Sequence, residues 1–251
     1  MGLGRRPFQG IANVVRFNWH FYIFAVIGLT AYLTINCYLP QKVQIMSLVV
    51  ALVAILSMVL SLISTYYIYD ISDLYELNWL DNMDNKKVLN INAGFDETSE
   101  IITHKYPLCQ LTPCDFYDPT KHTEVSIKRA RKAYPPQAKT VRTDTDKLPF
   151  ESNSFDCSVA ILSAHEIRNK SERIAFFTEL KRVTKPTGTI YVTEHRRDFP
   201  NFLAYTIGAL HFYSRPTWLS TFKEAELLLK QEIKTTPFIT NFILQPDGNT
   251  S

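Results

Sequence analysis

Two histidines follow apolar runs that read as neighbouring β-strands. His165 and Glu166 come after the run Phe155–Leu162, and His195 comes after the run Thr189–Glu194. In open α/β sheets ligands bind at the carboxyl ends of the strands, and an imidazole there can act as a general base that deprotonates an attacking oxygen or nitrogen. We therefore predict His165, Glu166 and His195 as catalytic residues. The alternative is that a histidine at a strand end makes only structural hydrogen bonds.

Cationic and apolar groups surround these positions. Arg196 and Arg197 follow His195, where they could bind an anionic acceptor through paired hydrogen bonds or contact lipid headgroups. The segment Asn201–Tyr213 is apolar and aromatic, which favours either a lid over a hydrophobic acceptor or a buried helix. A second basic group, Lys128–Lys132, reads as the solvated face of a helix, with attraction to anionic lipid as the alternative.

The elements that must hold these residues alternate between short apolar runs and longer amphipathic ones, the pattern of an α/β domain with a parallel sheet. The predicted strands are Lys87–Asn92, Gln110–Asp115, Thr140–Thr143, Phe155–Leu162 and Thr189–Glu194. The predicted helices are Glu97–Tyr106, His122–Ala133, Ser171–Val183 and Trp218–Leu229. The sequence Lys185–Gly188 is expected to end the third helix and turn into the next strand.

The end of the chain adds two more apolar runs, Leu229–Thr235 and Phe238–Leu244, separated by Pro237. Their closeness predicts an antiparallel hairpin at the edge of the sheet. The strand–helix units and this hairpin together predict a Rossmann-like, seven-stranded sheet of the kind that binds nucleosides.

The first 69 residues differ in composition from the rest. They contain no Asp or Glu, and two uncharged apolar stretches, Phe17–Leu39 and Val43–Tyr69, exceed the ~20 residues that a helix needs to cross a bilayer. The loop Pro40–Lys42 between them is so short that it predicts a two-helix transmembrane hairpin. Three arginines precede the first span and a single lysine lies at the tip, which predicts a two-pass protein of the cell (inner) membrane with both termini in the cytoplasm.

Charge and cysteine content argue against other classes of protein. The 182 residues after the predicted hairpin carry 23 Lys and Arg against 24 Asp and Glu, a balance that argues against a nucleic-acid-binding protein. The four cysteines form no CxxC pair and no HExxH sequence occurs, so we predict no metal site. The scattered cysteines fit a reducing compartment better than a disulfide framework.

A short segment joins the hairpin to the body. It places Ile71, Leu74, Leu77 and Leu80 at helical spacing, which predicts an amphipathic helix docked on the domain or lying at the membrane interface. The chain is thus predicted to consist of a tail with two transmembrane helices, an amphipathic linker and an α/β domain, at residues 1–69, 70–85 and 86–251.

Two motifs in the body resemble those of class I S-adenosylmethionine-dependent methyltransferases. Residues 144–156 (DTDKLPFESNSFD) are similar to the DxxxLPFxxxSFD segment of that family, and residues 179–188 (ELKRVTKPTG) to its ELxRVLKPGG segment. They occur in the family's order and at its separation, after a strand where the family's first motif lies. The resemblance covers the whole body and implies the family's fold, with S-adenosylmethionine as the cofactor.

The resemblance also implies which residues contact the cofactor. Only Gly94 remains of the family's glycine-rich turn, and Asn90 stands where the family has an acid. The implied contacts are Asn90, Asn92 and Gly94 in this turn, Asp115 (with Asp118 as the alternative) for the ribose hydroxyls, Asp144 and Thr145 for the adenine, and Ser163 in the pocket wall.

Two functions are compatible with these features. The first is a membrane-anchored methyltransferase that transfers the sulfonium methyl group to an oxygen, nitrogen or carbon of a small-molecule, lipid-like or membrane-associated acceptor, with the lipid bilayer as its other partner. The second is a non-catalytic methyltransferase-like module that has lost its glycine turn and serves as a binding or scaffold protein at the membrane.

Overall fold

The computed structural model of the chain describes residues 5–246. Residues 1–4 and 247–251, at the outer ends of the predicted tail and α/β domain, lie outside the described residues. Apolar runs form strands where the pattern predicts them. The strands are β1 (Lys87–Asn92), β2 (Gln110–Asp115), β3 (Val141–Arg142), β4 (Phe155–Ile161), β5 (Thr184–His195), β6 (Leu227–Lys234) and β7 (Ile239–Pro246).

The seven strands form one sheet in the order β3-β2-β1-β4-β5-β7-β6. The first five strands of the chain pair in parallel, and β7 pairs antiparallel with both β5 and β6. The predicted Rossmann-like sheet with an antiparallel edge hairpin is therefore confirmed. Because the order of the strands reverses between β1 and β4, the carboxyl ends of these two strands mark the place where such sheets bind ligands.

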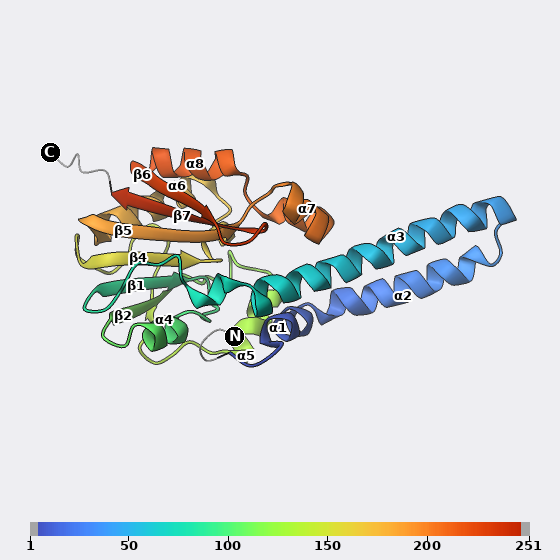
Figure 1. Cartoon of the computed structure of the whole chain (residues 1–251), viewed down its shortest axis with the longest axis horizontal. Helices are drawn as coiled ribbons and strands as arrows, with labels where there is room; N and C mark the ends of the chain where they lie inside the picture. Colours follow the sequence, from blue (N-terminus) through green and yellow to red (C-terminus); the bar gives the residue numbers. More distant parts are fainter. Residues whose placement is uncertain (1–4, 247–251) are drawn as a thin grey trace.

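Helices cover both faces of the sheet (Figure 1). α6 (Lys170–Val183) and α8 (Arg215–Glu224) pack on one face, and α4 (Ser99–Lys105) packs on the other together with residues 67–83. The first face is held by buried aromatic side chains from α6, α8 and β7: Phe176, Phe177, Trp218, Phe222 and Phe242.

Short elements surround the carboxyl edge of the sheet. They are α5 (Val125–Ala133), α7 (Phe199–Tyr205) and the 3-10 turns η3 (Ala164–Glu166) and η4 (Thr206–His211). η3 follows β4, and α7 with η4 follows β5. The residues predicted to do chemistry therefore lie on loops and short turns that a rigid sheet positions.

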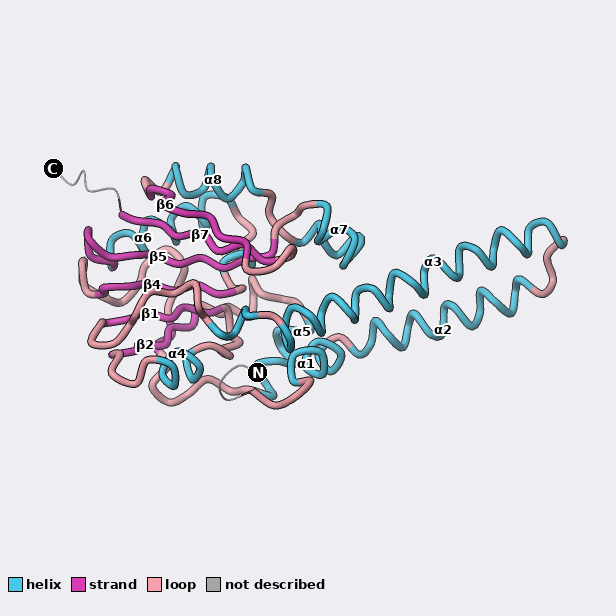
Figure 2. Tube along the Cα trace, viewed as in Figure 1, coloured by secondary structure: helices cyan, strands magenta, loops and turns pink. Residues whose placement is uncertain are grey.

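Three helices precede the domain. α1 (Gln9–Phe17) lies against it, and α2 (Trp19–Asn36) and α3 (Gln41–Tyr66) form a two-helix arm that projects away from the sheet (Figures 1 and 2). α2 and the helical stretch that begins with α3 are long and apolar enough to cross a membrane, judged by length and composition. Only 6% and 11% of the residues in their most apolar stretches are buried, so these helices are not a core that the domain covers.

Hydrogen bonds fix the base of the arm to the domain. The carboxylate of Asp70, shortly after α3, accepts the backbone N–H groups of Gly10 and Ile11 at 2.7 and 2.8 Å. These two donors are free at the start of α1, so Asp70 caps that helix from another part of the chain. Asn13 of α1 donates to Glu97 in the loop after β1 at 3.2 Å. α1 therefore joins the end of α3 to the edge of the sheet.

The linker differs from its prediction. Residues 70–84 do not form one amphipathic helix: a π-helical turn (Tyr67–Ile71) continues α3, and a 3-10 turn (Asp73–Glu76) ends where Leu77 takes a left-handed φ of 52°. Turns replace the helix because the chain must change direction between α3 and β1 while it covers the sheet. The apolar side chains are nevertheless buried against that face: Leu74, Leu77, Leu80 and Met83.

Two element boundaries also shift. The predicted helix Trp218–Leu229 ends at Glu224, because Glu226 takes a left-handed φ of 54° and the chain turns into β6. β5 begins at Thr184, so that Lys185–Gly188 lies within the strand, where its register against β4 shifts, and does not form a separate turn.

The apolar segment after β5 is not a buried helix. α7 lies beside α3 and continues into η4, and Phe212 after η4 reaches the cavity described below. Four large apolar side chains of the segment are exposed to solvent to about half or more: Phe202, Leu203, Ile207 and Leu210. The buried-helix alternative is therefore wrong, and the segment adds to the apolar surface of the arm.

Candidate active site

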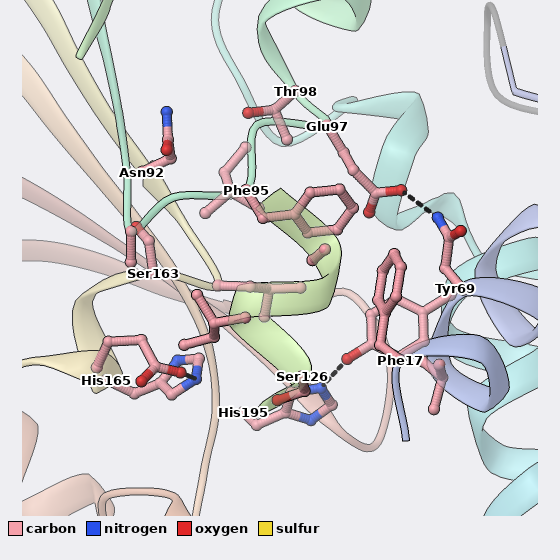
Figure 3. A pocket seen from close by; sticks show the side chains of 18 of the residues that line it. Phe17, Tyr69, Asn92, Phe95, Glu97, Thr98, Ser126, Ser163, His165 and His195 are labelled. Atoms are coloured by element: carbon pink, nitrogen blue, oxygen red, sulfur yellow. Dashed lines mark hydrogen bonds and ion pairs between the residues drawn. The ribbon is translucent and has the colours of Figure 1, made fainter. Parts of the chain in front are cut away.

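A cavity of about 270 Å³ opens at the carboxyl ends of β1, β4 and β5 (Figure 3). Its walls come from α1, the turn after α3, the loop after β1, α5 and the loops after β4 and β5. It therefore lies where open α/β sheets bind ligands, and the N-terminal helices close one of its sides. We call it the central cavity.

His195 and Tyr69 face each other in the wall of the central cavity (Figure 3). The Tyr69 hydroxyl lies 2.8 Å from His195 Nε2, and His195 Nδ1 lies 2.9 Å from Asn201 Oδ1. The Asn201 amide nitrogen donates to Asp198 Oδ1 and to the Phe238 carbonyl, so its oxygen faces the imidazole. We therefore assign the hydrogen to Nδ1, which leaves Nε2 as the acceptor of the Tyr69 hydroxyl.

Burial determines the charge of His195. Its side chain has lost its contacts with water, and this desolvation lowers the pKa of His195 to about 4, although the hydrogen bond to Asn201 acts in the opposite direction. His195 is therefore neutral at pH 7. Its Nε2 can accept a proton, and the lowered pKa makes His195 a weaker base than an exposed histidine.

His165 lies between two carboxylates. Its Nδ1 is 2.6 Å from Glu194 Oε2, and its Nε2 is 3.2 Å from Glu166 Oε1. Burial alone would lower the pKa of His165, but the two carboxylates raise it to about 10. Burial would also raise the pKa of Glu166, yet its hydrogen bonds to His165 and His211 hold it well below its usual value. His165 and Glu166 thus form an ion pair, and His195 is the histidine with the protonation state of a base.

Glu97 is a central polar group of this cavity. Its carboxylate accepts hydrogen bonds from Asn13 at 3.2 Å and Tyr75 at 2.8 Å, and it pairs with Arg5 at 3.0 Å. The ring of Phe95 also lines the cavity (Figure 3). A carboxylate close to an aromatic ring is a suitable environment for a small organic cation.

The turn after β1 is held by its own side chains. Asn90 donates to the hydroxyls of Thr98 and Ser99 at the start of α4, both at 2.9 Å. Asn92 accepts the backbone N–H of Gly94 at 2.9 Å. Asn90 is therefore fully engaged behind the turn and borders neither of the two cavities at this edge, whereas Asn92 lines the central cavity.

A second cavity, of about 360 Å³, lies on the other side of this turn. It is bordered by Gly94 and Asp115, and it shares Asn92 and Glu97 with the central cavity. Gly94 has a φ of 97°, and a Cβ there would lie 2.8 Å from the ring of Tyr117. Only glycine fits this position without displacing its neighbour.

Asp115 lies at the end of β2 as predicted, but its carboxylate is already paired. It accepts the N–H of Tyr117 at 2.9 Å and forms an ion pair with Arg131 of α5 at 2.5 Å. Arg129 of the same helix donates to the backbone carbonyl at the end of α1 at 2.7 Å. The prediction that Lys128–Lys132 is a solvated face is therefore wrong for Arg129 and Arg131, which hold α5 against the site.

The remaining predicted cofactor residues divide between the cavity and its surroundings. Ser163 lines the central cavity and donates to the Ile91 carbonyl at 3.1 Å. Asp144 is exposed, and Thr145 is buried and hydrogen-bonded to Glu172. Four of the predicted cofactor residues thus border the two cavities: Asn92, Gly94, Asp115 and Ser163. Three lie outside both cavities: Asn90, Asp144 and Thr145.

These groups fit S-adenosylmethionine in two halves. The central cavity offers Glu97 and Phe95 to the cationic ammonium and sulfonium groups, and the second cavity offers Asp115 to the ribose hydroxyls. Each cavity alone is near the lower limit of the ~300–1,000 Å³ that is typical of ligand sites. The cofactor therefore needs both cavities, and its ribose needs the Arg131–Asp115 pair to open.

Replacing Arg131 with Gln is expected to tighten the binding of S-adenosylmethionine about 10-fold or more. The substitution frees the Asp115 carboxylate, and a hydrogen bond to a charged group contributes about 1.5–3 kcal/mol. Isothermal titration of the full chain with S-adenosylmethionine measures the change, and Lys132→Gln on the same helix is the matched control. Weaker binding in the Arg131 variant would mean that the guanidinium itself contacts the cofactor.

Some groups of the site carry little signal in the sequence. Tyr69 reads as an interfacial aromatic residue, and Glu97 reads as the start of a helix. Asn201 has a recognisable signal, because Asp198 precedes it by three residues as a helix N-cap and accepts its N–H at 3.2 Å.

Arg196 is 8% exposed, so both predictions for it, an anionic acceptor or lipid headgroups, are wrong. It pairs with carboxylates of the domain, Glu232 at 2.7 Å and Asp198 at 3.2 Å.

The fold defines the class of protein. A solved S-adenosylmethionine-dependent methyltransferase from Aquifex aeolicus aligns with 76% of this chain and 98% of its own, with a TM-score of 0.52 at 14% sequence identity. At this identity the likeness shows the fold alone. The fold that the two motifs predict, that of the class I methyltransferases, is confirmed.

Sequence comparison agrees with the fold. Residues 89–192 match the family model described as "Methyltransferase domain", so this part of the chain is similar to S-adenosylmethionine-dependent methyltransferases. A ubiquinone/menaquinone biosynthesis C-methyltransferase from Pseudomonas aeruginosa is 33% identical over 76 residues, which are 30% of this chain and 28% of that protein. A demethylmenaquinone methyltransferase from Streptomyces avermitilis is 26% identical over 133 residues, 53% of this chain and 45% of that protein. The chain thus spans less than half the length of these curated relatives.

Proposed function

We propose that the chain is a membrane-anchored methyltransferase that uses S-adenosylmethionine to methylate a lipid-like or membrane-associated acceptor. One observation supports this most directly: the central cavity is built jointly by the methyltransferase domain and the base of the apolar arm. Tyr69, just beyond α3, contacts His195 at the end of β5. An arm that only held the domain at a membrane would not need to supply a side chain to the cavity.

The surface of the chain supports the same proposal. The apolar side chains of α2 and α3 are uncovered, and exposed apolar side chains on α7, which lies beside α3, extend the same apolar surface. An exposed apolar surface of this extent is typical of membrane contact. The proposal includes both termini in the cytoplasm, with the domain on the cytoplasmic side of the cell (inner) membrane, and the distribution of arginines supports this topology.

The residues of the cavity provide alignment and a route for a proton. S-adenosylmethionine, when bound, supplies an electrophilic methyl group on a sulfonium centre. An acceptor hydroxyl in the cavity gives its proton to Tyr69 Oη while Tyr69 gives its own to His195 Nε2, which becomes an imidazolium. The resulting oxyanion, or a ring carbon conjugated with it, is the nucleophile that takes the methyl group as S-adenosylhomocysteine leaves. A methylated ring carbon then gives up its hydrogen as a proton, which restores the aromatic ring.

The relatives suggest a first acceptor to test. Their names refer to C-methylation in ubiquinone and menaquinone biosynthesis and to demethylmenaquinone. A membrane quinol combines a ring hydroxyl, which suits the Tyr69–His195 pair, with an apolar body, which suits the surface of the arm. We therefore propose membrane quinols as the acceptor class to screen first.

The test uses the full chain in lipid nanodiscs with methyl-labelled S-adenosylmethionine. We expect label to pass from the cofactor to a reduced demethylated quinone or to a component of a membrane lipid extract. Lys230→Gln, on the edge strand β6 away from both cavities, is the control variant and is expected to keep the rate. Binding of the cofactor without transfer to any membrane component would contradict the proposed acceptor class.

One observation favours a non-catalytic module as the second candidate. Asp115, which is assigned to the ribose hydroxyls, is already paired with Arg131. Asn92 likewise accepts the N–H of Gly94 within its own turn, so both groups already have partners in the chain. If calorimetry detects no S-adenosylmethionine binding to the folded full chain or to its Arg131→Gln variant, the non-catalytic function is the correct one.

A further inference from the structure

A cluster of side chains suited to a metal ion lies at one wall of the central cavity. His165 and Glu166 of η3 and His211 of η4 each offer a ligand atom, and the three atoms lie within 4.8 Å of one another. Glu166 Oε1 is 3.2 Å from His165 Nε2 and 3.7 Å from His211 Nε2. Ligand atoms around a metal ion at about 2.0–2.2 Å are roughly 3–3.5 Å apart, so a small closure of the cluster completes the site.

The orientation of His165 is fixed as in many metal sites. Its Nδ1 is 2.6 Å from Glu194 Oε2, and its backbone N–H donates to Glu194 Oε1 at 3.1 Å. Glu194 is completely buried at the end of β5. Histidines that bind metals commonly donate their second ring N–H to a carboxylate, which aims the other nitrogen at the metal. Glu194 thus aims His165 Nε2 at Glu166.

The cluster already attracts positive charge. Glu124, just before α5, lies 3.2 Å from His211 Nδ1 and adds a second carboxylate. The guanidinium of Arg168 lies 4.0 Å from both Glu124 and Glu166 and donates to the His211 carbonyl at 2.6 Å. The same guanidinium lies 2.6 Å from His211 Nδ1 and also contacts His211 Nε2, so it occupies the position of a cation. The Arg168 side chain is 42% exposed, and it must move toward solvent before a metal ion can bind there.

We propose that His165, Glu166 and His211 bind a divalent first-row metal ion whose open positions face the central cavity. The ion takes the place of the proton on His165 Nε2, which leaves to solvent, and it contacts Glu166 in place of that proton. Two imidazoles and one carboxylate suit Zn²⁺, Fe²⁺ or Mn²⁺, and such a set leaves positions free for a further oxygen ligand. His165 and Glu166 line the cavity, so the free positions face the space assigned to the acceptor. The role of the metal rests on the proposed function: it holds an acceptor oxygen and favours its deprotonated form.

The test measures metal binding on the full chain without cofactor or acceptor. The protein in nanodiscs is stripped with a chelator and titrated with Mn²⁺ by electron paramagnetic resonance, and Zn²⁺ is then added as a competitor. We expect one Mn²⁺ per chain, displaced by Zn²⁺, because Zn²⁺ binds such donor sets more tightly than Mn²⁺. An absence of Mn²⁺ and Zn²⁺ binding to the folded protein would overturn the proposal.

Variants separate this site from weak surface binding. His165→Ala and His211→Ala are each expected to weaken metal affinity at least about 100-fold, and Glu194→Gln about 10- to 100-fold through the orientation of His165. His211 is partly exposed, so His211→Ala is expected to keep the fold even if His165→Ala does not. Arg168→Gln is expected to tighten metal binding, because the competing cation is gone. His104→Ala on α4 is the control, and equal affinity in all variants would show binding elsewhere.

The role of the metal is tested apart from its binding. If methyl transfer is observed and chelation abolishes it while S-adenosylmethionine binding persists, the metal acts on the acceptor. Methyl transfer that is equally fast without metal would overturn that role and leave the proposed function intact. Metal binding in a chain that shows no methyl transfer would contradict the proposed function and leave the metal site intact.

Discussion

Replacing His195 with Gln is expected to lower kcat of methyl transfer about 100- to 10,000-fold, the range that a positioned acid–base group contributes. The glutamine cannot take the Tyr69 proton, although it can still hydrogen-bond to both neighbours. The Kd of S-adenosylmethionine is expected to stay unchanged, because His195 lies on the acceptor side of the central cavity. Single-turnover rates with labelled cofactor measure the first quantity, and calorimetry measures the second.

The pH dependence provides the control for this assignment. Desolvation lowers the pKa of His195 to about 4, so the imidazole is neutral and able to accept a proton above that pH. The rate is therefore expected to be constant from neutral pH down to about pH 5 and to fall as the pH approaches about 4. Tyr69→Phe removes the hydroxyl between acceptor and imidazole and is expected to lower kcat while keeping the fold. A rate that is unchanged in both variants would remove the pair from the mechanism.

Replacing Leu74 with Ala is expected to lower the free energy of unfolding by about 2–5 kcal/mol. Leu74 belongs to the 3-10 turn after the arm, and its side chain is completely buried against the sheet. The substitution leaves a cavity that rigid strands cannot fill. Thermal unfolding of the full chain in detergent, followed by near-ultraviolet circular dichroism, measures the loss of stability.

Ile71 is the matched control, because it belongs to the same segment and its side chain is 57% exposed. Ile71→Ala is expected to change stability by no more than about 0.5 kcal/mol. Equal effects of the two substitutions would mean that the segment is not docked. The same packing implies that a fragment starting at residue 84 cannot fold alone, because one face of its sheet would be exposed without Leu74, Leu77, Leu80 and Met83.

The sheet could be predicted from the sequence because each of its strands is a short apolar run with a clear boundary. β1 and β2 lie at the predicted residues, and the edge hairpin follows from Pro237 between two apolar runs. The linker was predicted less well, since the spacing of its leucines shows that they are buried and does not distinguish a helix from a series of turns. Left-handed residues such as Leu77 and Glu226 carry no local signal, because the fold and not their type imposes the conformation.

The candidate site, like the fold, could be predicted only in part. Residues at strand ends, such as Asp115, Ser163 and His195, lie where the sheet topology predicts. Contacts between distant segments could not be predicted, and these decide the chemistry: Arg131 pairs with Asp115, and Tyr69 reaches His195 from a part of the chain that reads as a membrane span. The sequence also cannot show that Glu194 is the partner of His165, or that burial keeps the His195 imidazole neutral.

The cap that Asp70 places on α1 joins the arm rigidly to the domain, so the arm is not a flexible tether. A flexible tether would let the domain move freely above a membrane. A rigid arm instead fixes the height and tilt at which the cavity would face the lipid. Asp70 is the neighbour of Tyr69 in the chain, so a change in the tilt of the arm reaches the acid–base pair directly. If the chain is anchored in a membrane as proposed, bilayer thickness, which sets the tilt of membrane helices, is expected to change the reaction rate.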